Sequence, residues 1–286
     1  MKKVLLLLGV IVLFGGACHA SNLVDFKCGS NPYSGSFSYS NLLGTNFISE
    51  KIANAVLKKA ILKDSKGKYK VNLQSYNVTS LKKGIFKSLE IEGTDTVTDD
   101  IYASNVKFKT LCDYNYIETD NKNKTTTFKE PFGMTFVIGF SANDLNKTMQ
   151  GKKYSEIIRK ANNIGNSSKL FNITGSSAKI SENKLYYTME IKMPLLNKKQ
   201  KLTIETSVKA RSGEIMLCDT NLVTESFSFD ISKLDRIINY LNPLQFSMEL
   251  FENKGADVNI QDVTIKNNII NVSGFVTVEK DVVTEQ

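Results

Sequence analysis

FGMTFVIGF, at residues 132–140, is the stretch of this sequence that bears most directly on its fold. Its apolar residues occupy both odd and even positions, and its aromatic and β-branched residues favour strands. Successive side chains of a strand point to opposite faces of its sheet. The stretch therefore predicts a strand that is covered on both faces over at least part of its length.

Strand-like patterns on either side of this stretch predict further strands. They occupy residues 70–78, 89–91, 101–117, 170–173, 178–180, 184–193, 202–210, 214–229, 257–265 and 269–278. The strand over 101–117 is long enough to bend. The last two strands are joined by Lys266-Asn267-Asn268, a suitable turn for a hairpin.

Three amphipathic segments predict helices. In residues 46–63 the apolar face consists of Ile48, Ile52, Val56, Leu57, Ala60 and Ile61. A second helix begins at Ser141, which has capping-box spacing to Asp144, and Gly151 divides it. The third lies within residues 230–242. This order predicts an α+β fold in which a large curved antiparallel sheet wraps around amphipathic helices.

The first 20 residues have the layout of a secretory signal peptide. Two lysines precede an apolar run at 4–14 that is too short to span a bilayer, and small residues follow it. We expect cleavage after Ala20; the alternative is a lipoprotein acylated at Cys18, although Gly15 stands where a lipobox has Leu. Residues 21–45 form a leader that is either flexible or tied down by Cys28. Residues 46–286 then form a single extracytoplasmic domain, located in the periplasm, in the cell envelope or secreted.

Composition excludes several kinds of site. The only histidine, His19, lies in the signal segment, so residues 21–286 cannot form His-based catalytic or metal sites. No nucleotide-binding or nucleophile-elbow motif occurs, and the acid pair Asp99-Asp100 is typical of a solvated turn. We therefore expect no catalytic residues, no metal and no cofactor.

The charge of the chain indicates the chemistry of its partner. Without the two lysines of the signal, 37 − 2 = 35 basic and 29 acidic side chains remain, a balance of +6. This balance favours anionic partners, which outside the cytoplasm include acidic membrane surfaces. The lysines are scattered or paired, without a run of five, so we expect no nucleic-acid partner.

The phrase Leu-Cys-Asp-x-Asn occurs twice, at 111–115 and at 217–221. Both copies fall within predicted strands, and residues 46–120 and 141–225 resemble two weakly related halves. If the two strands are neighbours, Cys112 and Cys218 form a cross-strand disulfide. The alternative is that both are small buried thiols.

Three short segments resemble a known family. They are LKKGIFKSLEIEG at 81–93, SANDLN at 141–146 and DISKLDRIINYLNPL at 230–244, the last followed by strands that end in NVSGFV. They resemble the LmeA-like phospholipid-binding proteins of bacterial cell envelopes. The resemblance implies a tubular lipid-binding-like protein that holds phospholipid between a curved antiparallel sheet and a helix, without catalytic residues.

A bound lipid tail requires an apolar groove, in which each buried methylene contributes about 0.8 kcal/mol. We expect this groove to be lined by the first helix and by the strand at 132–140, through Ile52, Val56, Ile61, Phe132, Phe136 and Ile138. Lys82, Lys83 and Lys87 at its mouth would bind the headgroup phosphate. The same apolar residues are also compatible with a closed core. The competing function is that of a structural or adhesive envelope protein that binds a protein partner through a sheet edge.

Overall fold

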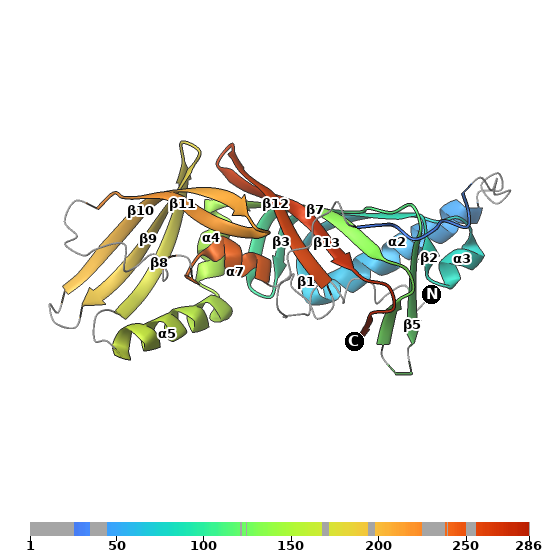
Figure 1. Cartoon of the computed structure of the whole chain (residues 1–286), viewed down its shortest axis with the longest axis horizontal. Helices are drawn as coiled ribbons and strands as arrows, with labels where there is room; N and C mark the ends of the chain where they lie inside the picture. Colours follow the sequence, from blue (N-terminus) through green and yellow to red (C-terminus); the bar gives the residue numbers. More distant parts are fainter. Residues whose placement is uncertain are drawn as a thin grey trace.

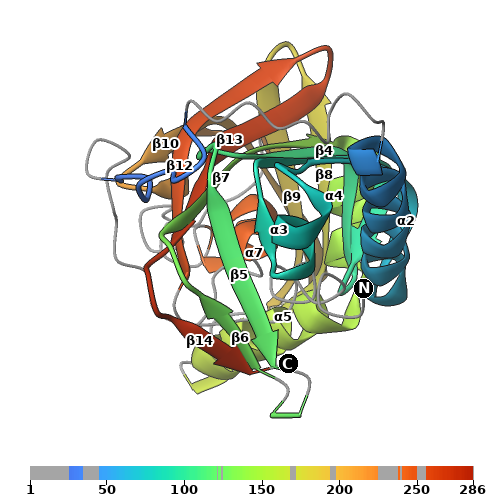
Figure 2. The ribbon, with the colours of Figure 1, turned by 90° about the vertical axis from the view of Figure 1, so that its right-hand side faces the viewer.

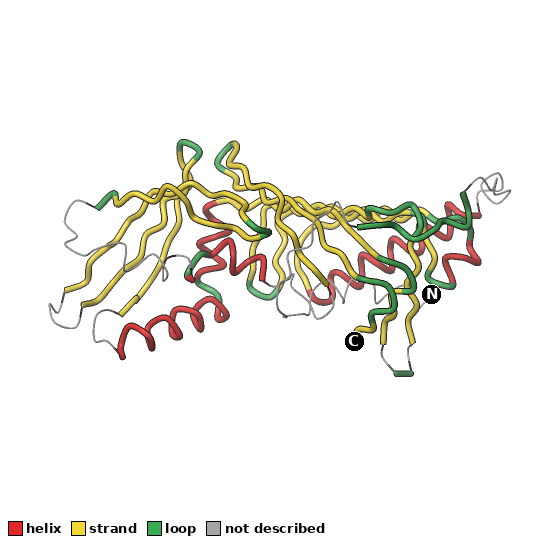
Figure 3. Tube along the Cα trace, viewed as in Figure 1, coloured by secondary structure: helices red, strands yellow, loops and turns green. Residues whose placement is uncertain are grey.

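The computed structural model describes residues 26–34, 45–120, 122–123, 125–167, 172–193, 198–224, 238, 240–249 and 256–285. The molecule is elongated, and its two larger sheets follow one another along the long axis (Figure 1). Strands outweigh helices along the trace (Figure 3), and all strand pairs are antiparallel. The predicted α+β class is confirmed at this level.

The larger sheet has six strands in the order β1-β3-β4-β7-β13-β12. They are β1 (Ser65–Gln74), β3 (Ser88–Thr98), β4 (Ile101–Thr110), β7 (Phe132–Ser141), β12 (Ala256–Lys266) and β13 (Ile269–Val278). Strand β7, which contains FGMTFVIGF, lies inside this sheet. The turn between β12 and β13 consists of Asn267 and Asn268 with φ of 54° and 58°, which confirms the predicted hairpin.

Strand β7 is covered mainly on one face. Met134, Phe136, Ile138 and Phe140 are buried, whereas Val137 on the opposite face is 39% exposed. At the opposite face, only the Gly133 end meets the leader: a Cβ atom placed there would lie 2.8 Å from the Phe26 ring. The prediction that at least part of the strand is covered on both faces is therefore confirmed at the Gly133 end, whereas the middle of the strand, at Val137, is covered on one face only. Gly133 and Gly139 do not interrupt the apolar pattern of the stretch, but they carry no side chain that a covering layer could bury.

The smaller sheet has the order β11-β10-β9-β8. Its strands are β8 (Asn172–Ser181), β9 (Lys184–Met193), β10 (Lys198–Arg211) and β11 (Glu214–Leu222). Helices α4 (Ala142–Met149), α5 (Lys152–Ser167) and α7 (Pro243–Glu249) lie on the same half of the molecule (Figure 1). Ser141 and Asp144 form the predicted capping box, and Gly151 separates α4 from α5.

Helix α7 was not expected from the sequence. Its first residue is Pro243, and the side chain of Asn242 accepts the N–H of Leu244 at 3.1 Å, which is a helix-start signal. The third predicted helix, within 230–242, lies mostly outside the described residues. Of its apolar residues, Ile238 and Leu241 are buried.

A third, small sheet has the order β14-β6-β5-β2, with β2 (Ile85–Phe86), β5 (Asn115–Asp120), β6 (Thr125–Phe128) and β14 (Val283–Glu285). The single strand predicted over 101–117 is in fact two strands, β4 and β5, because the chain leaves the ladder between them. Likewise β1 ends at Gln74 instead of continuing to 78. Asn77 then caps the short helix α3 (Val78–Lys82) by accepting the Ser80 N–H at 2.8 Å.

Helix α2 (Thr45–Asp64) covers the free edge of β1. The side chain of Asn54 accepts the N–H of Leu73 at 2.8 Å, and the Glu50 carboxylate accepts the N–H of Ser75 at 2.6 Å. An edge strand with unpaired N–H groups is open to pairing with another chain, so these bonds protect it. The helix consequently faces inward with Ala53, Leu57 and Ile61, which are buried.

A buried tyrosine pair joins α5 to β9. The Tyr154 hydroxyl donates to the Leu241 carbonyl and lies 2.9 Å from the Tyr187 hydroxyl. Both side chains are fully buried. Burial disfavours the phenolate, which raises the pKa of Tyr154 well above its usual value and that of Tyr187 to about 12.

The stability of the protein is therefore expected to fall in alkali. The folded pKa of Tyr187 is raised, so its contribution is complete below the unfolded value of about 10 and is lost as the pH rises to about 12. This loss amounts to about 2 to 3 kcal/mol. Thermal unfolding of the unmodified protein and of Tyr187→Phe, at pH values from about 10 to about 12, measures this loss of stability. The variant should lose about 1 kcal/mol near neutrality but decline less steeply in alkali; equal slopes would contradict the assignment.

Candidate functional site

The three candidate headgroup lysines are carried by the segment around α3, at one end of the molecule (Figure 1). Lys82 is the last residue of α3, Lys83 is its C-cap, and Lys87 lies between β2 and β3. The Lys87 N–H donates to the Gln74 carbonyl at 2.8 Å, which fixes the backbone there. All three side chains are exposed and form no ion pair within the described part of the chain.

The structure brings four of the six groove candidates into one apolar cluster. Ile61, Phe132, Phe136 and Ile138 are all buried members of it. Val56 is half-buried outside this cluster, and Ile52 is 43% exposed on the outward side of α2. The buried face of the helix is therefore rotated by part of a turn from the predicted face, so that Ile52 points outward. Apolar residues occur around much of this helix, so their spacing did not reveal that Asn54 and Glu50 must face β1.

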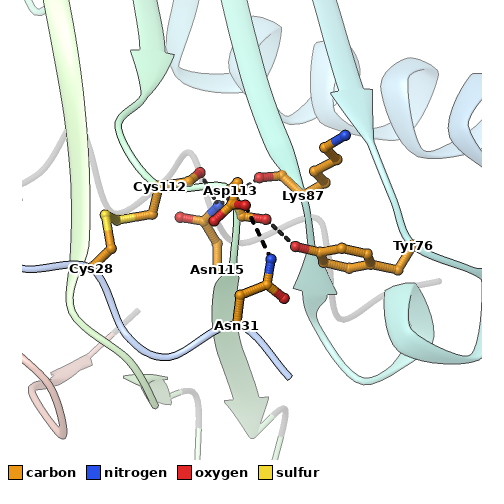
Figure 4. Close-up of a disulfide and its surroundings, with 7 residues drawn as sticks. All are labelled: Cys28, Asn31, Tyr76, Lys87, Cys112, Asp113 and Asn115. Atoms are coloured by element: carbon orange, nitrogen blue, oxygen red, sulfur yellow. Dashed lines mark hydrogen bonds between the residues drawn. A yellow bond between two sulfur atoms is a disulfide. The ribbon is translucent and has the colours of Figure 1, made fainter. Parts of the chain in front are cut away.

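The disulfide joins Cys28 to Cys112, with their Cα atoms 5.6 Å apart (Figure 4). The predicted pair of Cys112 and Cys218 is wrong. Cys218 is a free, half-buried thiol in β11, which belongs to the smaller sheet, whereas Cys112 follows β4 of the larger sheet. The two copies of the repeated phrase are therefore never strand neighbours. The alternative in which Cys28 ties down the leader is confirmed.

Around this disulfide the leader is bonded to the body of the protein. Asn31 donates to the Asp113 carboxylate at 3.1 Å, and the Tyr76 hydroxyl donates to the Asp113 carbonyl (Figure 4). The Asn115 side chain donates to the carbonyls of Lys87 and Cys112, each at 3.0 Å. This network connects the backbone of Lys87 to the disulfide.

Three tyrosines gather beside the network and were missed by sequence reasoning. The rings of Tyr33 and Tyr76 stack at 4.3 Å between centroids, and Tyr114 lies 6.2 Å and 6.4 Å from them. Burial is the main cause that raises the pKa of Tyr76 and Tyr114. Tyr114 is buried and the other two rings are half-buried, so the cluster packs the leader against the body of the protein. The three tyrosines lie far apart in sequence, so no short-range pattern groups them.

The described acids show no arrangement for metal binding. Asp99 and Asp100 form the turn between β3 and β4, with φ of 52° and 69°, and Asp99 pairs with Lys153 at 3.0 Å. In the part of the chain that the structure describes, no group of three or more His, Cys, Asp or Glu side chains is placed to hold a metal ion. None of the helices described is long and apolar enough to cross a membrane.

Comparison of the chain with known protein families, with curated proteins and with solved structures returned no match. The resemblance to LmeA-like proteins therefore stays a prediction that rests on its three short segments.

Proposed function

We propose that this protein is an extracytoplasmic, non-catalytic lipid-binding protein. In this proposal the six-stranded sheet curves, in the manner of tubular lipid-binding domains, so that its apolar face and α2 enclose acyl chains. The lysines around α3 contact the phosphate of the headgroup. The predicted signal peptide and the disulfide, which is compatible with an oxidising compartment, support the location.

The observation that carries the proposal is the continuous apolar face of the larger sheet. One row of paired residues crosses all six strands through Val71, Ile91, Phe108, Phe136, Gly274 and Ile260. The next row crosses through Tyr69, Gly93, Val106, Ile138, Val272 and Val263. Among the buried residues of the described chain, Asp144 in α4 is the only one that carries a charge.

The opposite face of the same sheet is polar. Lys107 lies 2.8 Å from Glu90 and 3.0 Å from Glu92, and Lys70 lies 3.7 Å from Glu92. This face is therefore suited to water, and the apolar face is the one suited to acyl chains. With ten-residue strands that face is about 30 Å long, and each methylene buried against it contributes about 0.8 kcal/mol.

Mass spectrometry of an organic extract tests the proposal. We expect protein that is secreted and purified without detergent to carry phospholipid in a near-stoichiometric amount. An empty extract, together with a failure to take up lipid from vesicles, would mean that the apolar face is a filled core. The search would then move to protein partners.

Neighbouring residues of β7 offer a matched pair of variants. Ile138 is 1% exposed on the apolar face, whereas Val137 is 39% exposed on the polar face. Ile138→Trp should displace bound lipid, while Val137→Trp should leave the lipid content unchanged. In a filled core, Ile138→Trp would instead cost about 1 to 3 kcal/mol of stability by overpacking.

The headgroup part of the proposal has a separate test. Lys82→Glu/Lys83→Glu should weaken the uptake of anionic lipid about tenfold or more, because two unpaired ammonium groups become carboxylates. The uptake of zwitterionic lipid should change less. If the variant takes up anionic lipid as the unmodified protein does, these lysines do not bind the headgroup.

A further inference from the structure

Helix α2 presents an apolar stripe to solvent on the side that faces away from the sheet. Ile48 is 62% exposed, Ile52 43% and Leu62 43%, and Ala55 and Lys59 between them are also exposed. The spacing of 48, 52, 55, 59 and 62 is alternately four and three residues, which places these side chains on one face of a helix. In the view along the long axis, α2 stands at the flank of the molecule (Figure 2). The stripe is therefore accessible and does not belong to the apolar core.

Lysines lie beside this stripe and, at Lys59, within it. Lys51, Lys58, Lys59 and Lys63 are exposed on the same helix. Its two acids do not lie on the stripe: Glu50 bonds to the N–H of Ser75, and Asp64 is the last residue of the helix. The outward face thus combines aliphatic side chains with positive charge.

The net charge of the chain is concentrated in residues 51–70, which cover most of α2 and the first half of β1. Residues 51–70 contain seven lysines and one aspartate, so their charge is 7 − 1 = +6. Residues 21–286 as a whole carry 35 − 29 = +6, so everything outside 51–70 sums to zero. Within the described part of the chain, Lys58, Lys59, Lys63, Lys66 and Lys68 form no ion pair.

We propose that the outward face of α2 docks the protein onto an anionic bilayer surface. A helix that lies in a membrane interface buries aliphatic side chains at the boundary of the acyl chains and surrounds them with lysines. The lysine stems lie along the apolar surface while their ammonium groups reach the phosphates. Each lysine near an anionic surface contributes binding energy that is weakened by salt.

The composition of the face disfavours three other binding partners: a different protein, a second copy of this chain and an anionic polymer. Protein interfaces are enriched in aromatic residues, methionine and arginine and depleted of lysine, whereas this face has lysines and aliphatic residues. A second copy of the chain would bring two sets of four lysines together. An anionic polymer would satisfy the lysines but would leave Ile48 and Ile52 in water. A bilayer with acidic headgroups satisfies both components.

This proposal does not require lipid inside the protein. If the organic extract is empty, the interior lipid site is wrong but α2 can still bind a membrane. If the extract holds lipid and the α2 variants bind vesicles normally, the docking face is wrong while the lipid-binding function stands. The two failures are therefore distinguishable.

Flotation of the purified protein with vesicles provides the experiment. Vesicles of phosphatidylglycerol and phosphatidylcholine in equal parts are compared with pure phosphatidylcholine at low and high salt. We expect binding to the anionic vesicles that weakens with salt. No binding to anionic vesicles, or equal binding to both kinds, would overturn the proposal.

Two variants test the two components of the face. Lys58→Glu/Lys59→Glu should weaken binding about thirtyfold or more, through the loss of two lysine contacts and the added repulsion. Ile48→Ser/Ile52→Ser changes no charge and should weaken binding about tenfold, because two aliphatic anchors are lost. All four positions are exposed, so circular dichroism should show both variants folded.

Matched controls lie on the smaller sheet. Lys179→Glu/Lys192→Glu makes the same change in net charge at exposed positions of β8 and β9, and Val223→Ser removes a side chain that is 48% exposed. Both should bind vesicles nearly as the unmodified protein does. Equal weakening by Lys179→Glu/Lys192→Glu would mean that net charge, and not α2, drives binding. If Ile48→Ser/Ile52→Ser dissociates an oligomer but keeps vesicle binding, the face is a contact between copies and the proposal is wrong.

Discussion

Replacing Cys28 and Cys112 together by serine is expected to lower the free energy of unfolding by about 2 to 5 kcal/mol. The bond spans a sequence separation of 84 residues, so its loss frees a long loop in the unfolded chain. In the folded protein the described part of the leader would then be held by non-covalent contacts, among them those to Asp113, Ser80 and the Tyr76 ring. Thermal unfolding should show a midpoint lower by about 5–15 °C.

Cys218→Ser is the matched control for this variant. It removes the free thiol and no covalent bond, so its midpoint should stay close to that of the unmodified protein. Limited proteolysis should cut the leader near Lys27 faster in the double variant than in the control. If Cys218→Ser is the more damaging change, the assignment of the disulfide is wrong.

Replacing Gly84 by alanine is expected to cost about 3 kcal/mol or more. Gly84 has φ of +87°, and an added Cβ atom would lie 1.8 Å from the carbonyl oxygen of Ile117. That oxygen belongs to backbone and cannot rotate away. Gly84 also accepts the N–H of Ile117 at 3.0 Å, so any shift that relieves the clash breaks this bond between the turn and β5. Because Gly84 immediately follows Lys83, the variant should also weaken the binding of anionic lipid.

Gly175→Ala in β8 makes the same chemical change without these obstacles. Its Cβ atom would lie 3.5 Å from the nearest side-chain atom, and Gly175 does not have a positive φ. Denaturant unfolding of the two variants side by side measures the difference. Similar stabilities would show that the turn at Gly84 adapts and that the close approach to β5 is not required.

Much of the local structure could be predicted from short-range patterns. The hairpin at Asn267 and Asn268, the capping box of Ser141 and Asp144, and the break at Gly151 all formed as expected. These signals depend on the backbone preferences and hydrogen bonds of residues a few positions apart. Alternation likewise predicted most strands, since a one-sided sheet imposes a period of two on its strands.

The candidate site could be predicted only in part, because it depends on contacts between residues that are far apart in the sequence. Ile52 was assigned to the interior because residues 46–63 carry apolar residues on more than one side of the helix. The hydrogen bonds of Asn54 and Glu50 to the backbone of Leu73 and Ser75 show which side turns inward. Tyr33, Tyr76 and Tyr114 could not be grouped either, because the disulfide brings the first of them to the other two.

By itself, the sequence determined the α+β class and the absence of histidine from residues 21–286. These properties are local or compositional, so they do not depend on how the strands are ordered. The tertiary structure alone decided that Cys112 pairs with Cys28 and that Ile48 and Ile52 face solvent. The first outcome depends on where the leader lies against the segment between β4 and β5, and the second on the hydrogen bonds of Asn54 and Glu50 beside the edge of β1; no short-range pattern connects these residues.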